Sequence, residues 1–275
     1  MIPNVLKAGV KRALGVVGVE VRRKGSGGAP APAAVGSPRC SLSGALRQAR
    51  ERGFVPATVI DVGAAFGWFA AECHGVFPEA EYVLVEPLEE YRPHLDAFVG
   101  AHPSKALLVQ AAAAERPGEM TIHVHPDLMG SSLYLEEEVA NVNGVPRTVK
   151  TVALDDIVDE RGLKPPFLLK VDVQGAELDV LAGFEKHLQE TEFVLLEVSF
   201  FKFFEGGPQL HDVVEFMRSK GFVAYDVYDL QYRPLDNALS QVDMVFVKES
   251  GRFRQHHYYA SRRQREEQFK TVPTA

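Results

Sequence analysis

The sequence has few cysteines and no long apolar run. Only Cys40 and Cys73 occur in 275 residues, and they do not have the spacing of metal ligands. This scarcity argues against a disulfide framework and is typical of a reducing compartment, so we predict a cytoplasmic protein. No hydrophobic stretch is long enough to span a bilayer. The composition, 46% hydrophobic and 24% charged, indicates one sizeable α/β domain with extensions.

The net charge of −7 is unevenly distributed along the chain. Residues 1–24 carry six Lys/Arg and one Glu, and residues 251–275 carry six Lys/Arg and two Glu. The segment between these ends is therefore strongly acidic, which argues against nucleic acid as the main substrate. The basic ends are suited to contact with anionic surfaces.

The terminal segments are expected to lie outside the main domain. Residues 1–24 have the pattern of a basic amphipathic helix, which either makes a peripheral membrane contact or packs on the body or a partner subunit. An oligomer is therefore an open possibility. Residues 25–40 are rich in Gly, Ala and Pro and predict a flexible linker. We assign residues 41–250 to the main domain and 251–275 to a basic tail.

The complete dinucleotide fingerprint G-x-G-x-x-G is missing, but residues 57–87 have the layout of a nucleotide-binding βαβ unit. A β-branched run ends in Asp61, a small-residue turn contains Gly63 and Gly67, and the next predicted strand ends in Glu86. Glycines let the backbone approach a ligand closely, and the following helix offers free N–H groups. A carboxylate at the second strand end can accept hydrogen bonds from both ribose hydroxyls.

The order D-x-G-x-x-x-G and then an acid favours S-adenosylmethionine (SAM) as the nucleoside. Ala65 stands where the dinucleotide fingerprint requires its middle glycine. SAM has no pyrophosphate, and its cationic amino and sulfonium groups suit nearby carboxylates. A dinucleotide site and a tight turn without a ligand remain the alternatives.

Two further predicted strands carry acids near their carboxyl ends. Residues 167–173 are apolar except for Lys170 and Asp172, and the period of two places both on one side together with Gln174. A buried lysine and aspartate are costly unless they are paired or functional. Open α/β sheets bind ligands at this edge. Glu197 repeats the pattern near the end of the predicted strand 193–198.

The remaining segments alternate between predicted helices and strands. Helices are expected at 41–52, 68–76, around 89–99, from 177 with an apolar face that reaches Leu188, and at 211–220; further strands are expected at 106–109, 120–124, 149–157 running into a helix start, 222–227 and 242–247. A long hairpin through residues 228–241 joins the last two strands, so the last strand should be antiparallel.

Three other segments have open interpretations. His123 and His125 share one face of a predicted strand, where a rim position is favoured over a metal site because no third ligand is evident. Residues 111–114 are all alanine, which suits either an adenine ring or ordinary packing. The aromatic-rich residues 199–207 are either a lid over an acceptor or a core-packing elbow.

Several stretches together resemble the FkbM-type SAM-dependent methyltransferases. They are VIDVGAAFGWFA at 59–70, VEP at 85–87, TVALDDI at 151–157, KVDVQGAELDVLAG at 170–183 and LLEV at 195–198. The resemblance covers roughly residues 55–250. It implies a Rossmann-like class I methyltransferase fold, with a seven-stranded mostly parallel sheet whose last strand is antiparallel and helices on both faces. It also implies O-methylation, commonly of sugar or polyketide hydroxyls.

The resemblance implies roles for particular residues. Asp61, Gly63 and Gly67 would line the methionine end of SAM, Glu86 would hold the ribose, and Gln110 or its neighbours would lie by the adenine. The predicted cofactor-binding set is Asp61, Gly63, Ala64, Phe66, Gly67, Glu86, Gln110 and Asp172. Gln174 stands where an acid is frequent in the family, which makes a metal role for that position doubtful. A divalent metal is possible but has no support in the sequence.

The predicted reaction is methyl transfer to a hydroxyl of a sugar, glycolipid, polysaccharide or natural product. Asp172 is the first candidate general base, Glu197 the second and His125 the third, while Lys170 would orient a carboxylate or depress its pKa. The same polar residues would alternatively form a structural network under the cofactor. A dinucleotide-dependent oxidoreductase and a non-catalytic SAM-binding or scaffold module are the competing functions.

Overall fold

The computed structural model describes residues 39–137 and 142–270. The predicted amphipathic helix 1–24 and nearly all of the predicted linker 25–40 lie outside these residues. Within the described part of the chain, no helix has both the length and the apolar character needed to cross a membrane.

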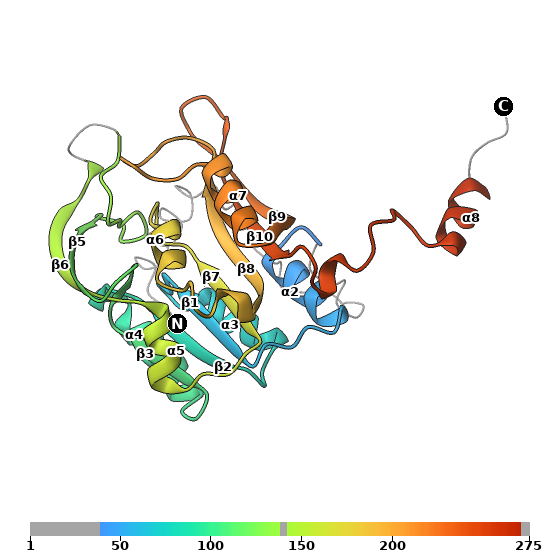
Figure 1. The fold of residues 1–275 in the computed structure, drawn as a ribbon. Coiled ribbons are helices and arrows are strands. Elements are labelled where there is room, and N and C mark those ends of the chain that lie inside the picture. The colour runs from blue at the N-terminus through green and yellow to red at the C-terminus, as the bar shows by residue number, and fades with distance from the viewer. Residues whose placement is uncertain (1–38, 138–141, 271–275) are drawn as a thin grey trace, which may run out of the picture.

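A seven-stranded sheet in the order β3-β2-β1-β7-β8-β10-β9 forms the centre of the molecule (Figure 1). Its strands are β1 (Thr58–Val62), β2 (Glu81–Val85), β3 (Ala106–Val109), β7 (Phe167–Val171), β8 (Thr191–Ser199), β9 (Phe222–Tyr232) and β10 (Leu239–Lys248). All neighbouring pairs are parallel except those of β10, which is antiparallel to both β8 and β9. The predicted sheet with a reversed last strand is confirmed.

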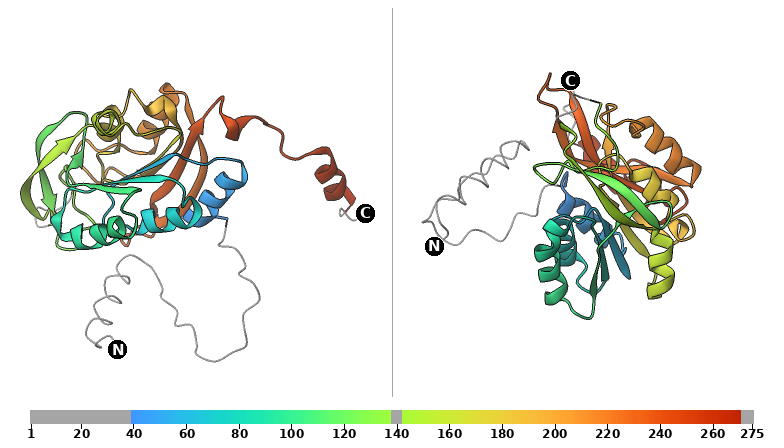
Figure 2. Two further views of the ribbon diagram at one scale, coloured as in Figure 1. Left: turned by 90° about the horizontal axis from the view of Figure 1, so that it is seen from below. Right: turned by 90° about the vertical axis from the view of Figure 1, so that its left-hand side faces the viewer.

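Helices cover both faces of this sheet, as predicted. The helices are α2 (Leu42–Glu51), α3 (Trp68–Val76), α4 (Arg92–Ala101), α5 (Leu154–Arg161), α6 (Glu177–Ala182) and α7 (Leu210–Ser219), with short 3₁₀ turns at Glu89–Tyr91 and Leu188–Glu190. Residues of α2, α3 and α4 pack in one hydrophobic cluster, and residues of α5, α6 and α7 pack in a second cluster. The two layers are visible on opposite sides of the strands in Figure 2.

Burial on both faces explains why the central strands are almost continuously apolar. Every residue of β1 is buried, including Asp61, and β7 is buried except for the partly exposed Lys170. These two strands pair in register, with Asp61 opposite Lys170. The two charged side chains therefore meet inside a layer that is otherwise hydrophobic.

A second sheet of three strands, in the order β4-β6-β5, extends from the side of the body that carries β3 (Figure 1). It consists of β4 (Ala112–Ala113), β5 (Gly118–Val124) and β6 (Val145–Val152). The alanines of residues 111–114 are at most 5% exposed. Packing in and beside this sheet therefore accounts for their small size, and they leave little surface for an adenine ring.

Several predicted boundaries differ from the structure, most clearly at β6, at α6 and at the last hairpin. Strand β6 spans Val145–Val152, whereas the strand was expected to begin at residue 149. The helix α6 ends at Ala182 instead of reaching Leu188, because Gly183 packs against β4 so closely that a Cβ there would lie 2.1 Å from the Ala114 carbonyl oxygen. The hairpin between the last two strands is also shorter than expected. Strands β9 and β10 extend to Tyr232 and from Leu239, so that six residues connect them.

The C-terminal segment leaves the body after a short turn that follows β10. A short 3₁₀ turn at Arg252–Arg254 packs Phe253 into the core, and α8 (Arg262–Lys270) follows. No residue of α8 is buried, and Figure 2 shows this helix standing away from the sheet.

Candidate active site

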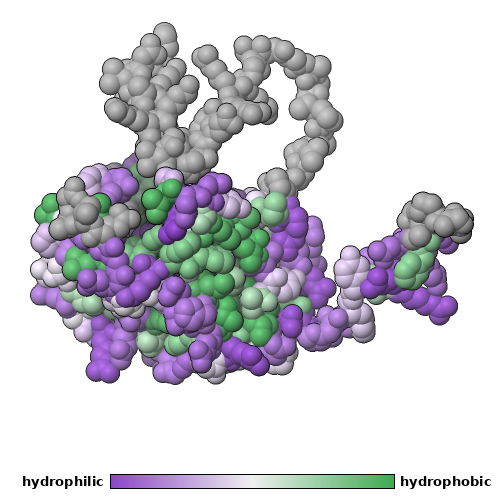
Figure 3. Space-filling view, turned by 90° about the horizontal axis from the view of Figure 1, so that it is seen from above, coloured by the Kyte–Doolittle hydropathy of each residue, from purple (hydrophilic) through white to green (hydrophobic). Residues whose placement is uncertain are grey.

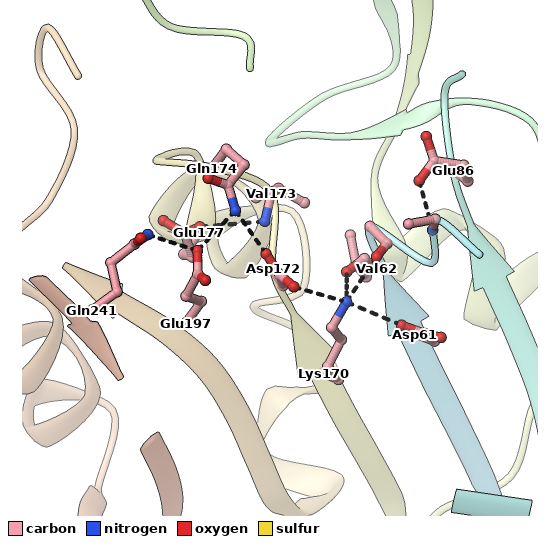
Figure 4. A network of polar contacts seen from close by, with 12 residues as sticks. Asp61, Val62, Glu86, Lys170, Asp172, Val173, Gln174, Glu177, Glu197 and Gln241 are labelled. Carbon is pink, nitrogen blue, oxygen red and sulfur yellow. Dashed lines mark hydrogen bonds and ion pairs between the residues drawn. The ribbon is translucent and has the colours of Figure 1, made fainter. Parts of the chain in front are cut away.

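Acidic side chains from adjacent strands gather at the carboxyl edge of the sheet (Figure 4). Asp61 belongs to β1, Asp172 follows β7 and Glu197 belongs to β8, so each strand of this central trio contributes one acid. Glu86 follows β2 on the other side of β1. The parallel order of the strands thus brings together residues that are far apart in the sequence.

The turn between β1 and α3 requires glycine. Gly63 has φ +70, and a Cβ there would lie 1.9 Å from the Asp172 carbonyl oxygen. Gly67 has φ +74 and immediately precedes α3. Between them, Ala65 adopts φ +45, an unusual conformation for a residue with a side chain. Its N–H donates to Glu86 Oε2 at 3.0 Å, which ties the turn to the end of β2.

Glu86 is almost completely buried and is held from two sides. Besides Ala65, the Leu88 N–H donates to Glu86 Oε1 at 2.9 Å. Burial raises the pKa of Glu86 to about 7 and outweighs these two hydrogen bonds, which favour the ionised form. The Gln110 amide donates to the Glu86 backbone carbonyl at 2.8 Å. The predicted ribose and adenine residues are therefore in contact.

Lys170 occupies the centre of the network. Its Nζ donates to the carbonyl oxygens of Val62 at 3.2 Å and Gly63 at 2.7 Å, and lies 3.4 Å from Asp61 Oδ1 and 3.5 Å from Asp172 Oδ2. Burial by itself lowers the pKa of Lys170, but the surrounding carboxylates outweigh it and raise the pKa above the usual value. Its hydrogen-bond and ion-pair partners among the described residues are all oxygen atoms, and the ring centre of Phe69 lies 6.0 Å from Nζ.

Asp61 is the least satisfied polar group of the site. Its side chain is 1% exposed, and neither carboxylate oxygen has a hydrogen bond of normal geometry to any described residue. Burial raises the pKa of Asp61. The charge of Lys170, its contact with the carboxylate and the Ala70 N–H lower this pKa, but by less than burial raises it. A buried carboxylate in this state is suited to an additional cationic partner.

A chain of amide hydrogen bonds joins the acids of β7 and β8. Gln174 Nε2 donates to Asp172 Oδ1 at 3.0 Å and to Glu197 Oε2 at 2.8 Å. Gln241 and Gln231 also donate to Glu197, at 2.9 and 3.3 Å. Burial, followed by the charge of Asp172, raises the pKa of Glu197 well above its ordinary value. Glu197 is thus a fixed group enclosed by amides, whereas the Asp172 side chain is 39% exposed.

A cavity of about 190 Å³ opens at this edge. Six of the predicted site residues line it: Gly63, Ala64, Phe66, Lys170, Asp172 and Glu197. The other five lie outside its lining: Asp61, Gly67, Glu86, Gln110 and His125. On the face drawn in Figure 3, apolar surface gathers near the middle and hydrophilic side chains surround it. The exposed Trp68 and Met129 contribute apolar surface to the cavity wall.

His125 lies in the turn after β5, apart from the other candidate bases. Its Nδ1 is 2.7 Å from Asp127 Oδ1, and the same turn places Met129 at the cavity. Across residues 39–137 and 142–270, no group of three His, Cys, Asp or Glu side chains has the arrangement of a metal site. His125 does not line the cavity, and its predicted catalytic role stays a prediction.

Asp243 and Tyr228 line the cavity but were not predicted as site residues. Asp243 on β10 pairs with Glu197 on β8 and with Tyr228 on β9. Burial first, and then the charges of Asp172 and Asp229, raise the pKa of Asp243 to about 7. An acid within the apolar run of residues 242–247 is the same signal that identified Asp172, and it was available in the sequence.

Residues 61–224 match the family model described as the Methyltransferase FkbM domain. The chain belongs to this family. The predicted family resemblance and the predicted enzyme class, a SAM-dependent methyltransferase, are thereby confirmed.

The relatives of this FkbM methyltransferase include other methyltransferases. The 2-O-methyltransferase NoeI of Sinorhizobium fredii is 28% identical over 178 residues, which are 60% of this chain and 73% of NoeI. The hexuronic acid methyltransferase AglP of Haloferax volcanii is 25% identical over 138 residues, 50% of this chain and 54% of AglP. A solved FkbM methyltransferase from Methylobacillus flagellatus aligns with TM-score 0.44 and 16% identity over 68% of this chain and 43% of that one.

Proposed function

We propose that this FkbM methyltransferase transfers the methyl group of SAM to a hydroxyl group of a sugar. The observation that carries the proposal is Asp61, a buried carboxylate without a well-formed hydrogen bond, directly below a glycine turn at the carboxyl edge of the sheet. A cationic ligand seated on that turn would add to the positive charge that Lys170 already places 3.4 Å from Asp61 Oδ1. NoeI is a 2-O-methyltransferase, which supports methylation of a hydroxyl oxygen, and AglP is a hexuronic acid methyltransferase, which supports a sugar as the acceptor.

The residues at this edge fit SAM chemically. Asp61 would attract the cationic amino and sulfonium groups, and Gly63 keeps the backbone free of a Cβ. Glu86 uses two acceptor positions for backbone N–H groups, and a carboxylate has about four, so two remain for ribose hydroxyls. Gln110 carries a buried Oε1 without a hydrogen bond to the described residues, which suits an amino group such as that of adenine.

SAM supplies an electrophilic methyl group when it is bound. The protein's own contribution is to orient the hydroxyl, to exclude water and to remove one proton. Asp172 is the first candidate base because its side chain is accessible at the cavity and is held from one side by Gln174. Lys170 positions Asp172 and keeps the turn closed through the carbonyl groups of Val62 and Gly63.

The other candidate bases are less suited to this step. Glu197 is enclosed by three glutamine amides, so proton transfer to it would require rearrangement of that cluster. His125 lies outside the cavity lining. Glu197 is therefore proposed as a positioning group that acts on Asp172 through Gln174.

An Asp172→Asn variant tests this assignment. Loss of the base should lower kcat by about 10²–10⁴-fold, whereas the Kd for SAM, measured by calorimetry, should change by less than about threefold. Turnover is measured as transfer of label from methyl-labelled SAM to a panel of glycosides. Asp96→Asn, on the exposed side of α4, is the matched control and should leave both quantities unchanged. Equal losses in turnover and SAM affinity would contradict a role as base.

A further inference from the structure

The cavity wall is strongly acidic. Among the described residues that line it, four carry carboxylates and one carries a cation: Glu72, Asp172, Glu197 and Asp243 against Lys170. Asp61 adds a fifth carboxylate directly beneath the turn. The net single positive charge of SAM would not neutralise this set. Because burial raises the pKa of Asp61, Glu197 and Asp243, the last to about 7, this set becomes more negative as pH rises, and an acceptor meets the strongest negative potential above about pH 7.

Lys170 is not available to an incoming anion. Two backbone carbonyls and the carboxylates of Asp61 and Asp172 surround its Nζ within 3.5 Å. No arginine or histidine occurs among the described residues of the cavity wall. A carboxylate on the acceptor would thus find no free cation in this part of the site, and a partly buried position would screen the repulsion only weakly.

Among these acids, Asp243 is the best placed to interact with the acceptor. It lies on β10, opposite Glu197 on β8 and Tyr228 on β9, on the side of the cavity away from the glycine turn. No hydrogen bond to its carboxylate is found within the described residues, whereas Glu197 is enclosed by amides and Asp172 contacts Gln174. Above about pH 7, an acceptor would therefore meet an ionised Asp243 carboxylate to which no described residue donates a hydrogen bond.

We infer that the hydroxyl acceptor carries no negative charge near the reacting oxygen and that Asp243 is a residue that determines this specificity. The inference rests on the proposed sugar methyltransferase function and narrows it to uncharged or cationic acceptors. Like-charge repulsion is a common means of rejecting a wrong partner. On this point the chain would differ from the hexuronic acid methyltransferase AglP.

Matched pairs of acceptors test the inference directly. The methyl glycosides of glucose, galactose and mannose are compared with the corresponding methyl glycosiduronates, using methyl-labelled SAM and the full chain. We expect kcat/KM for the neutral member of a pair to exceed that for the uronate by about tenfold or more. Methyl glucosaminide should be methylated at least as well as methyl glucoside. Equal or preferred methylation of the uronates would overturn the inference.

Variants that each remove one negative charge test which acid causes the preference for neutral acceptors over uronates. Asp243→Asn should reduce the neutral-to-uronate ratio by about threefold or more. Glu249→Gln, which removes an exposed charge just beyond β10, should leave the ratio unchanged. If the Asp243 variant fails to fold, Glu72→Gln at the same cavity provides the second test. A ratio that no cavity variant alters would contradict the specificity role.

Failure of the proposed sugar methyltransferase function would give a different result in these assays. If the protein binds SAM but methylates neither member of any pair, the sugar acceptor itself is wrong and the inference is overturned with it. If uronates are methylated and neutral glycosides are not, the sugar methyltransferase function stands and only the charge preference is overturned.

Discussion

Glu177 is a buried acid that supports the site without lining it. Its side chain is 4% exposed, and its Oε1 accepts hydrogen bonds from the N–H groups of Val173 at 3.3 Å and Gly175 at 3.1 Å. These bonds fix the loop that carries Asp172 and Gln174. Burial raises the pKa of Glu177 to about 7 because the ionised form loses its hydration, and the backbone hydrogen bonds only partly offset this loss.

This pKa predicts a pH dependence of stability. The folded-state pKa lies above the unfolded value, so the native state binds the proton more tightly and stability falls as pH rises from about 4.5 to about 7. Glu177→Gln keeps an oxygen acceptor but does not titrate. As pH rises across this range, the free energy of unfolding of the variant should increase relative to that of the wild type by about 1–3 kcal/mol. Urea unfolding at both ends of the range measures the difference, and parallel curves would contradict the assignment.

The turn between β1 and α3 is the element on which the site depends most. Gly63 touches the chain just after β7, Ala65 is bonded to Glu86 after β2, and Lys170 on β7 binds the carbonyl groups of the turn. One loop of five residues thus joins three strands. Its left-handed conformations are strained for residues with a side chain, and the contacts around it hold them in place.

Gly63→Ala should therefore be severely destabilising. The new Cβ would lie 1.9 Å from the Asp172 carbonyl at φ +70, so the turn must move away from β7. We expect a loss of about 2–4 kcal/mol in the free energy of unfolding and loss of SAM binding. Gly75→Ala in α3 is the matched control, because nothing lies within 4 Å of its Cβ position. The control should be neutral or slightly stabilising, and similar behaviour of the two variants would contradict this account.

Elements with local signals could be predicted from the sequence, and elements defined by distant pairing could not. Helix α3 begins and ends at Trp68 and Val76 as expected, because the glycine turn and the apolar pattern are local. The three-stranded sheet was predicted only as isolated segments, since β4 and β6 pair across almost forty residues of chain. The early end of α6 depends on the contact between Gly183 and Ala114, which no local pattern shows.

At the scale of the whole molecule, the parallel sheet assembles the site. Asp61, Lys170 and Glu197 come from neighbouring strands, and their convergence follows from the strand order β1-β7-β8; the sequence resemblance implied the mostly parallel sheet but not this order. Asp243 joins them only because the reversed strand β10 inserts between β8 and β9. His125 follows β5 of the three-stranded sheet and does not line the cavity. Its position along the chain gives no indication of this.

The central claim, that this edge of the sheet binds SAM, is tested most directly by isothermal titration of the protein with SAM, S-adenosylhomocysteine and NAD. We predict micromolar binding of the two adenosyl ligands and no binding of NAD. Glu86→Ala should weaken the binding by at least about tenfold, whereas Glu89→Ala, at an exposed position nearby, should not. Binding of NAD instead, or of none of the three ligands, would contradict the account.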